Sequence, residues 1–344
     1  MRLVIAFLVF SLNAADWPHW RGPDRSSHSS ESSGWDEGVR LPDEATWEAE
    51  FGDGATAPLV IGDTLYTLGW RNGQDTLYAV EAATGKTRWS QSYPCPKYGR
   101  HATGDQGMYR GVTATPEYDA DSGYLYSLST DGDLRCWDTA DAGKTVWSLN
   151  LYERYKIPRR PQVTGRKGSL RDYGYTSAPL VVGNHVLVEV GAAIGNVIAY
   201  DKKTGKEQWR SENKDPAGHS GGLSPITVEG VACVAVITAR HLSVFRVDNG
   251  QEVAKHPWIT DFINNIATPH RHRQSRAGVL QIQHPGHRPR RDHTRWRPRD
   301  LAQQSRHRRL QPPRTQESRL LGQPRFLLPR SRGRARPLER RPFQ

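Results

Sequence analysis

Residues 58–89, PLVIGDTLYTLGWRNGQDTLYAVEAATGKTRW, decide the fold of this chain. They contain four short runs that favour β-structure, at 59–61, 65–68, 77–80 and 88–89, and the runs are separated by turn-forming residues that include glycine. Glycine can adopt the positive φ that reverses the chain in a tight turn. The stretch therefore predicts one four-stranded antiparallel meander.

The same pattern recurs over residues 116–147, 179–209 and 225–258, and a fifth copy begins at 267–269. The prolines that open successive copies are 58, 63, 46 and 44 residues apart, which is the length of a propeller blade with insertions between some blades. Four copies in register favour a propeller over unrelated hairpins in a β-sandwich. We predict an all-β β-propeller of four-stranded antiparallel blades, with about four complete blades, the start of a fifth, and an incomplete ring.

A tryptophan ends each copy, four residues after the turn glycine in the first three copies and eight residues after it in the fourth. On the outermost strand, such a ring would fill the space against the next blade and contribute at most about 4–6 kcal/mol. Another tryptophan precedes the first copy, so residues 45–51 are predicted to be the outer strand of a blade completed by the C-terminal part of the chain. The predicted structural set is Trp47, Trp89, Trp147, Trp209 and Trp258.

The segments AVEAATGKTRW and AYDKKTGKEQW, in the first and third copies, resemble the repeat of PQQ-like β-propellers. That superfamily includes quinoprotein alcohol dehydrogenases, which hold pyrroloquinoline quinone and calcium on the propeller axis, and non-catalytic members such as the outer-membrane assembly lipoprotein. The resemblance covers residues 45–269 and implies the fold without specifying an activity. The segment DWPHWRGPDR, at 16–25, resembles the start of secreted PQQ-repeat proteins of planctomycete-type bacteria.

The N-terminal region divides into two parts. Residues 1–15 combine an early arginine, an apolar run at 3–10 and small residues before Asp16, which is the pattern of a signal peptide; an N-terminal strand or buried helix is the alternative. Residues 16–44 are polar and are expected to form an irregular segment over the surface. No apolar stretch reaches the 18 residues of a membrane span. We therefore expect a periplasmic or secreted protein that is not transmembrane.

Two long insertions, 93–112 and 152–175, and a glycine-rich connector at 215–222 join the copies. Long loops on a rigid β-scaffold often carry function, although solvated loops without a ligand are the alternative. Charged and titratable groups on these loops could converge above the propeller axis. The predicted ligand-binding residues are Arg110, Arg171, Asp172 and His219, and no catalytic or metal-binding residue is predicted.

Residues 270–344 differ from the rest of the chain. They contain 21 Arg, no Lys and four acidic residues, for a net charge of +17, whereas residues 1–269 carry a net charge of −5 and use ten Lys beside 17 Arg. Arg, Pro, His and Gln replace the strand pattern directly after Pro269. The sequence predicts a disordered tail read out of frame, from a protein that is longer in β-repeats. A basic arm that binds nucleic acid is the alternative, and we expect no specific nucleic-acid partner.

Two functions remain open. The first is a non-catalytic binding or scaffold module, without a cofactor, for an unknown protein or small-molecule ligand. The second is a quinoprotein oxidoreductase, which needs a tryptophan platform for pyrroloquinoline quinone, oxygen ligands for calcium and an aspartate base. Asp105, Asp172 and Asn264 are single candidates that do not form the enzyme motif. The sequence therefore favours the binding module.

Overall fold

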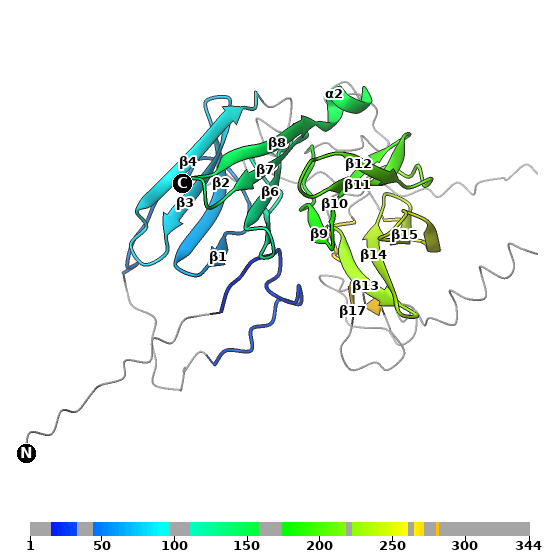
Figure 1. Cartoon of the computed structure of the whole chain (residues 1–344). Helices are drawn as coiled ribbons and strands as arrows, with labels where there is room; N and C mark the ends of the chain where they lie inside the picture. Colours follow the sequence, from blue (N-terminus) through cyan, green and yellow to red (C-terminus); the bar gives the residue numbers. More distant parts are fainter. Residues whose placement is uncertain are drawn as a thin grey trace, which may run out of the picture.

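The computed structural model describes residues 15–32, 44–96, 111–157, 174–217, 222–260, 265–271 and 280–281. These residues form four four-stranded antiparallel sheets, each a meander in chain order (Figure 1). The predicted all-β fold with propeller-like blades is confirmed. We call the four sheets blades 1 to 4.

The bounds of the strands follow the repeated pattern. Blade 1 contains β1 (Leu59–Ile61), β2 (Thr64–Arg71), β3 (Gln74–Glu81) and β4 (Thr87–Pro94). Blade 2 contains β5 (Glu117–Asp119), β6 (Tyr124–Leu128), β7 (Asp133–Asp138) and β8 (Lys144–Asn150), followed by the helix α2 (Leu151–Tyr155). Blade 3 contains β9 (Leu180–Val182), β10 (His185–Ala192), β11 (Gly195–Asp201) and β12 (Glu207–Arg210). Blade 4 contains β13 (Ser224–Val228), β14 (Val231–Ile237), β15 (His241–Arg246) and β16 (Glu252–Pro257).

The meander gives every blade two distinct ends. The turns between the first and second strands and between the third and fourth strands lie at one end, which we call the turn end. The turns between the second and third strands lie at the other end, where the fourth strand also leaves for the next blade. We call this the loop end, because the long insertions predicted from the sequence all leave from it.

One contact recurs between neighbouring blades at the turn end. The rings of Trp47, Trp89, Trp147 and Trp209 lie on Gly85, Gly143, Gly205 and Gly250, respectively. A Cβ atom would come within 2.5 Å of the Trp47 ring at Gly85 and within 2.7 Å of the Trp147 ring at Gly205. Both glycines also have a left-handed φ, of 73° and 67°. Two constraints therefore select glycine at this position of the turn.

The fourth blade departs from this contact. Its paired register matches Val244 with Ala254, at the place where Ala199 of blade 3 is matched with Trp209. Trp258 lies beyond the end of β16, and its backbone N–H donates to the carbonyl of Arg240 at the loop end, at 2.8 Å. The eight-residue offset from Gly250 thus places an alanine, not a tryptophan, on the outer strand.

The core lies between the blades. Leu77 and Tyr93 of blade 1 pack in one buried cluster with Leu125 and Trp137 of blade 2. Equivalent clusters join blade 2 to blade 3 and blade 3 to blade 4. The three cysteines, Cys95, Cys136 and Cys233, are buried free thiols, and burial raises the pKa of Cys136 to about 12.

The predicted outer strand at 45–51 forms no ladder with any described strand. It lies over the face of blade 1, with the Trp47 ring on Gly85 and the Phe51 ring 5.1 Å from that of Tyr78. The strands predicted to pair with it are not among the described residues, which after Pro269 form only β17 (His270–Arg271) and β18 (Leu280–Gln281), paired with each other. Residues 1–14 and most of 270–344, which carry the signal-peptide and tail predictions, lie outside the described residues.

Candidate functional site

The four predicted ligand-binding residues, Arg110, Arg171, Asp172 and His219, lie outside the described residues, as do Asp105 and Asn264. The described residues that flank them lie at the loop end. Gly111 follows Arg110 directly and packs so closely on the carbonyl of Asp53 that a Cβ would overlap it. Ala217, two residues before His219, packs against Gly191 near the end of β10.

Backbone hydrogen bonds fix the bases of all three connections. Leaving β4, the N–H of Cys95 donates to the carbonyl of Gly73 at 2.8 Å. In the connection before β9, the N–H of Tyr175 donates to the carbonyl of Thr130 at 3.0 Å. In the connection between blades 3 and 4, the carbonyl of Pro216 accepts the N–H of Ala239 at 2.9 Å. Each connection is thus tied to a turn between the second and third strands. The three connections therefore rise from one surface of a rigid scaffold.

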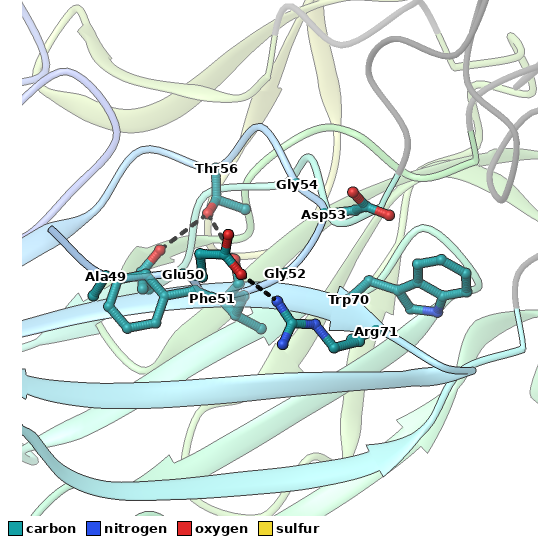
Figure 2. Close-up of a pocket in the computed structure, with 11 residues that line it drawn as sticks. Ala49, Glu50, Phe51, Gly52, Asp53, Gly54, Thr56, Trp70 and Arg71 are labelled. Atoms are coloured by element: carbon teal, nitrogen blue, oxygen red, sulfur yellow. Dashed lines mark hydrogen bonds and ion pairs between the residues drawn. The ribbon is translucent and has the colours of Figure 1, made fainter.

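A cavity of about 540 Å³, which we call the groove, opens beside blade 1 at this end (Figure 2). It lies between the segment 49–56 and β2, where Asp53 and Trp70 exchange two backbone hydrogen bonds of 2.8 Å. At Gly69, a Cβ atom would overlap the carbonyl of Phe51, so only glycine allows this close crossing. The lining residues are Ala49, Glu50, Phe51, Gly52, Asp53, Gly54, Thr56, Thr67, Leu68, Trp70 and Arg71.

The cavity combines both signs of charge with aromatic surface. Figure 2 shows the Arg71 guanidinium directed at Glu50, at 3.2 Å, with the Trp70 ring on the other side. The two charged side chains are 59% and 91% exposed, so water screens their attraction and a ligand can rearrange them at little cost. The Trp70 ring is held in place because its indole N–H donates to the carbonyl of Cys95 at 2.7 Å. The groove suits a polar or mixed ligand.

An acid–base cluster lies at the loop end of blade 4. Asp215 is within 2.6 Å of the His241 ring nitrogen Nδ1, 3.1 Å of the Thr238 hydroxyl and 3.7 Å of Lys255 Nζ. Burial raises the pKa of Asp215, but the bond from His241 and the charge of Lys255 outweigh it and hold the pKa below its ordinary value. The Thr238 hydroxyl also accepts the backbone N–H groups of Arg240 and His241. The hydroxyl is fully engaged and is no candidate nucleophile.

Asp215 and His241 were missed in the sequence because 26 residues separate them and neither belongs to a motif. The pair stabilises the connection at 213–217, which also receives the N–H of Ala239. In the described part of the chain, no group of three or more His, Cys, Asp or Glu residues is placed to hold a metal ion. Calcium takes six to eight oxygen ligands, and Asp105, Asp172 and Asn264, the single candidates from the sequence, lie outside the described residues.

Four meanders joined by tryptophan–glycine contacts define a β-propeller repeat protein. A family model described as outer membrane protein assembly factor BamB, a PQQ-like repeat family, matches residues 101–286, more than half of the chain. The chain therefore belongs to the PQQ-like/BamB β-propeller repeat family. This confirms the repeat family predicted from the sequence.

Curated relatives include quinoprotein enzymes. The dehydrogenase subunit of the quinone alcohol dehydrogenase of Gluconobacter oxydans is 34% identical over 158 residues, which are 44% of this chain and 18% of the enzyme. The quinohemoprotein alcohol dehydrogenase ADH-IIG of Pseudomonas putida is 31% identical over 160 residues, with the same two shares. The matched part thus spans less than one fifth of these relatives, to which the chain is distantly related.

Two solved structures resemble the chain at low sequence identity. BamB from Moraxella catarrhalis is 16% identical, with a TM-score of 0.40 and coverage of 69% of this chain and 60% of that one. A europium-containing methanol dehydrogenase is 15% identical, with a TM-score of 0.38 and coverage of 71% and 58%. Within the described residues, no helix is long and apolar enough to cross a membrane.

Proposed function

We propose that this protein is a non-catalytic binding or scaffold module that acts in the periplasm or outside the cell. The observation that carries the proposal is the loop end, where three interblade connections and the groove beside blade 1 share one surface. The blades beneath are held by buried interblade clusters, so a ligand meets a preformed base.

Family membership supports a role in binding. The description of the matching family, outer membrane protein assembly factor, names assembly rather than a chemical reaction. The apolar run at 3–10 supports export, and N-terminal sequencing of the protein from its host is expected to begin at Ala15 or Asp16. An intact Met1 on protein from the cytoplasmic fraction would refute export.

Site-specific photo-crosslinking tests the binding surface. A photoreactive residue at Arg71, in the groove, is expected to crosslink a defined partner in the organism that encodes the chain. The same residue at Lys144, which is 76% exposed at the turn end of blade 2, is the matched control and should not capture that partner. Equal capture from both positions would contradict a binding site at the loop end.

A quinoprotein oxidoreductase is the second candidate, favoured by the 34% identity to a quinone alcohol dehydrogenase subunit. Titration of the purified protein with pyrroloquinoline quinone and Ca²⁺ separates the two functions. The binding module should show no saturable absorption band of bound quinone and no alcohol-dependent reduction of an electron-accepting dye. Saturable binding at one quinone per chain, with turnover of an alcohol, would replace our proposal with the enzyme.

A further inference from the structure

The N-terminal segment 16–27, which we call the clasp, binds the first strands of two blades. Trp17 and Val60 of β1 exchange two backbone hydrogen bonds, of 2.7 and 3.2 Å, and the N–H of Tyr118 in β5 donates to the carbonyl of Pro18 at 3.1 Å. Each first strand has a ladder neighbour on one side only, so its other edge is free to pair. In Figure 1, the clasp is the dark-blue segment beside β1.

Glu117 is the centre of this contact. Its side chain is 0% exposed and lies on β5. Two guanidinium nitrogens of Arg25, Nη1 at 3.1 Å and Nη2, donate to its two oxygens, and Nδ1 of His19 lies 3.2 Å away. The carboxylate also accepts the N–H of Val181 in β9, at 3.1 Å. One side chain thus ties the clasp, blade 2 and blade 3 together.

The positive charge at this site comes from the clasp. Among the described residues, Arg25 is the permanent cation paired with Glu117, His19 adds a charge only when its ring is protonated, and the blades supply a neutral backbone N–H. A buried carboxylate is costly unless it is paired with a cation and hydrogen-bonded. The guanidinium of Arg25 fits this need because its planar fork meets both carboxylate oxygens at once. Burial raises the pKa of Glu117, but Arg25 and His19 hold it below the ordinary value.

The clasp keeps a shape that a free peptide would seldom adopt. Arg21, Arg25 and Ser27 have left-handed φ angles of 69°, 57° and 63°, each of which is unfavourable for a residue other than glycine. The Trp17 ring covers Gly22, where a Cβ would come within 2.7 Å of it. The contacts with β1, β5 and Glu117 therefore select this conformation.

We propose that the free edges of β1 and β5 around Glu117 form a binding site for a peptide segment that carries an arginine, and that residues 16–27 fill this site as an exchangeable clasp. A partner segment would add to the edges of β1 and β5 through main-chain hydrogen bonds, with its guanidinium on Glu117. The site is separate from the loop-end groove and does not depend on the function proposed above.

Hydrogen–deuterium exchange on the full chain tests the role of the arginine. The reporters are the backbone amides of Trp17, Val60 and Tyr118, which donate across the contact. In Arg25→Gln they should exchange at least about tenfold faster, because the buried carboxylate loses its cation. Amides in the β14–β15 ladder should keep their protection and show that the fold is intact. Arg88→Gln, which removes the exposed pair with Asp63 in blade 1, is the matched control and should not change the reporters.

A synthetic peptide of residues 15–32 then tests exchange in trans. Added in excess to the full-length Arg25→Gln protein, it should restore protection at Val60 and Tyr118, whereas the same peptide with Arg25→Gln should not. In a full-length Glu117→Gln protein, the two peptides should act alike, because the carboxylate that discriminates between them is gone. Unchanged reporters in Arg25→Gln, or equal action of the two peptides on that protein, would overturn the proposal.

Discussion

At the scale of single residues, the blades are joined by an indole ring lying on a turn glycine. The indole N–H groups of Trp47, Trp147 and Trp209 also donate to the carbonyls of Ala82, Lys202 and Val247, at 3.0, 3.1 and 2.8 Å. Each accepting carbonyl lies three residues before the turn glycine of the next blade. The two contacts together set the distance and the orientation of blade 3 on blade 2 and of blade 4 on blade 3, and between blades 1 and 2 Trp89 makes the ring contact with Gly143.

Gly205→Ala tests this contact. The new Cβ would meet the Trp147 ring and would also occupy a left-handed φ of 67°. Gly183→Ala, in the same blade, has a similar φ of 58° but open space around its Cβ, so it measures the backbone cost alone. We expect Gly205→Ala to be less stable than Gly183→Ala by about 1–3 kcal/mol, the usual cost of overpacking. Chemical denaturation of both variants gives the difference. Equal stabilities would show that the Trp147 ring can move away from the new Cβ without loss of stability.

Asp215 gives a pH prediction at the same scale. Because its folded pKa lies below its ordinary value of 3.8, its contribution to stability is fully present above that value. The contribution is lost as the pH falls through the folded pKa. Asp215→Asn removes the charge that His241 and Lys255 share, and it should cost about 1–3 kcal/mol at neutral pH. The difference between the free energies of unfolding of the two proteins, measured between pH 7 and pH 3, should begin to narrow only below pH 3.8. A pH-independent difference would rule out the ionised carboxylate as the cause.

At the scale of elements, the crossing of the segment 49–56 over β2 forms the groove. Gly69→Ala should push this segment away, because the new Cβ overlaps the carbonyl of Phe51. The amides of Asp53 and Trp70, which bond across the crossing, should then exchange faster with deuterium, while the β10–β11 ladder stays protected. Gly73→Ala, in the adjacent turn, places alanine at a left-handed φ of 78° but puts its Cβ in open space, so it controls for backbone strain and should leave both amides unchanged. Protected amides in Gly69→Ala would mean that the crossing tolerates a side chain.

The blades could be predicted from the sequence because each meander joins neighbouring runs through turns that glycine marks, as at Gly62 and Gly85. The sequence predicts Trp258 as the repeat tryptophan of blade 4 only because it is a tryptophan near the end of the copy. The strand register instead places Ala254 at the outer-strand position that Trp209 occupies in blade 3. The sequence predicts an irregular segment where the clasp lies. Its contacts with Val60 and Glu117 join residues far apart in the chain, so no repeated spacing in the sequence indicates them. The four proposed ligand-binding residues remain predictions.

At the scale of the whole molecule, the open face of blade 1 is covered by the segment 44–56, which follows the path of an outer strand without a partner. Trp47 makes the same contact as the three tryptophans between blades, so the segment is placed to complete a further blade. The described residues after Pro269 provide only two strands of two residues each. A closed ring therefore requires more β-strands than the described residues form.

The composition after Pro269 suggests where such strands are encoded, and we propose that the reading frame changes there. Histidine codons begin with CA and end in a pyrimidine, so read one base later they specify Ile, Met or Thr. Arginine codons of the CGN type, read one base later, specify Val, Ala, Gly, Asp or Glu. The run from His270 to Arg273, which alternates the two residues, would then alternate Ile or Thr with Val, Ala, Gly or Asp, so its histidine positions would become β-branched residues that favour strands.

Sequencing of the gene across the codons for Thr268 to His270 tests this proposal directly. We expect an added or missing base, and the restored frame should encode an apolar run followed by a turn signal and further copies of the repeat that ends in tryptophan. Because the family match extends to residue 286, beyond Pro269, only the DNA sequence decides where the frame changes. A chain expressed from the restored frame should bury the edge that the segment 44–50 leaves unpaired, and it should aggregate less than the present chain. A confirmed frame, together with a soluble monomer whose residues 270–344 resist protease, would refute the proposal.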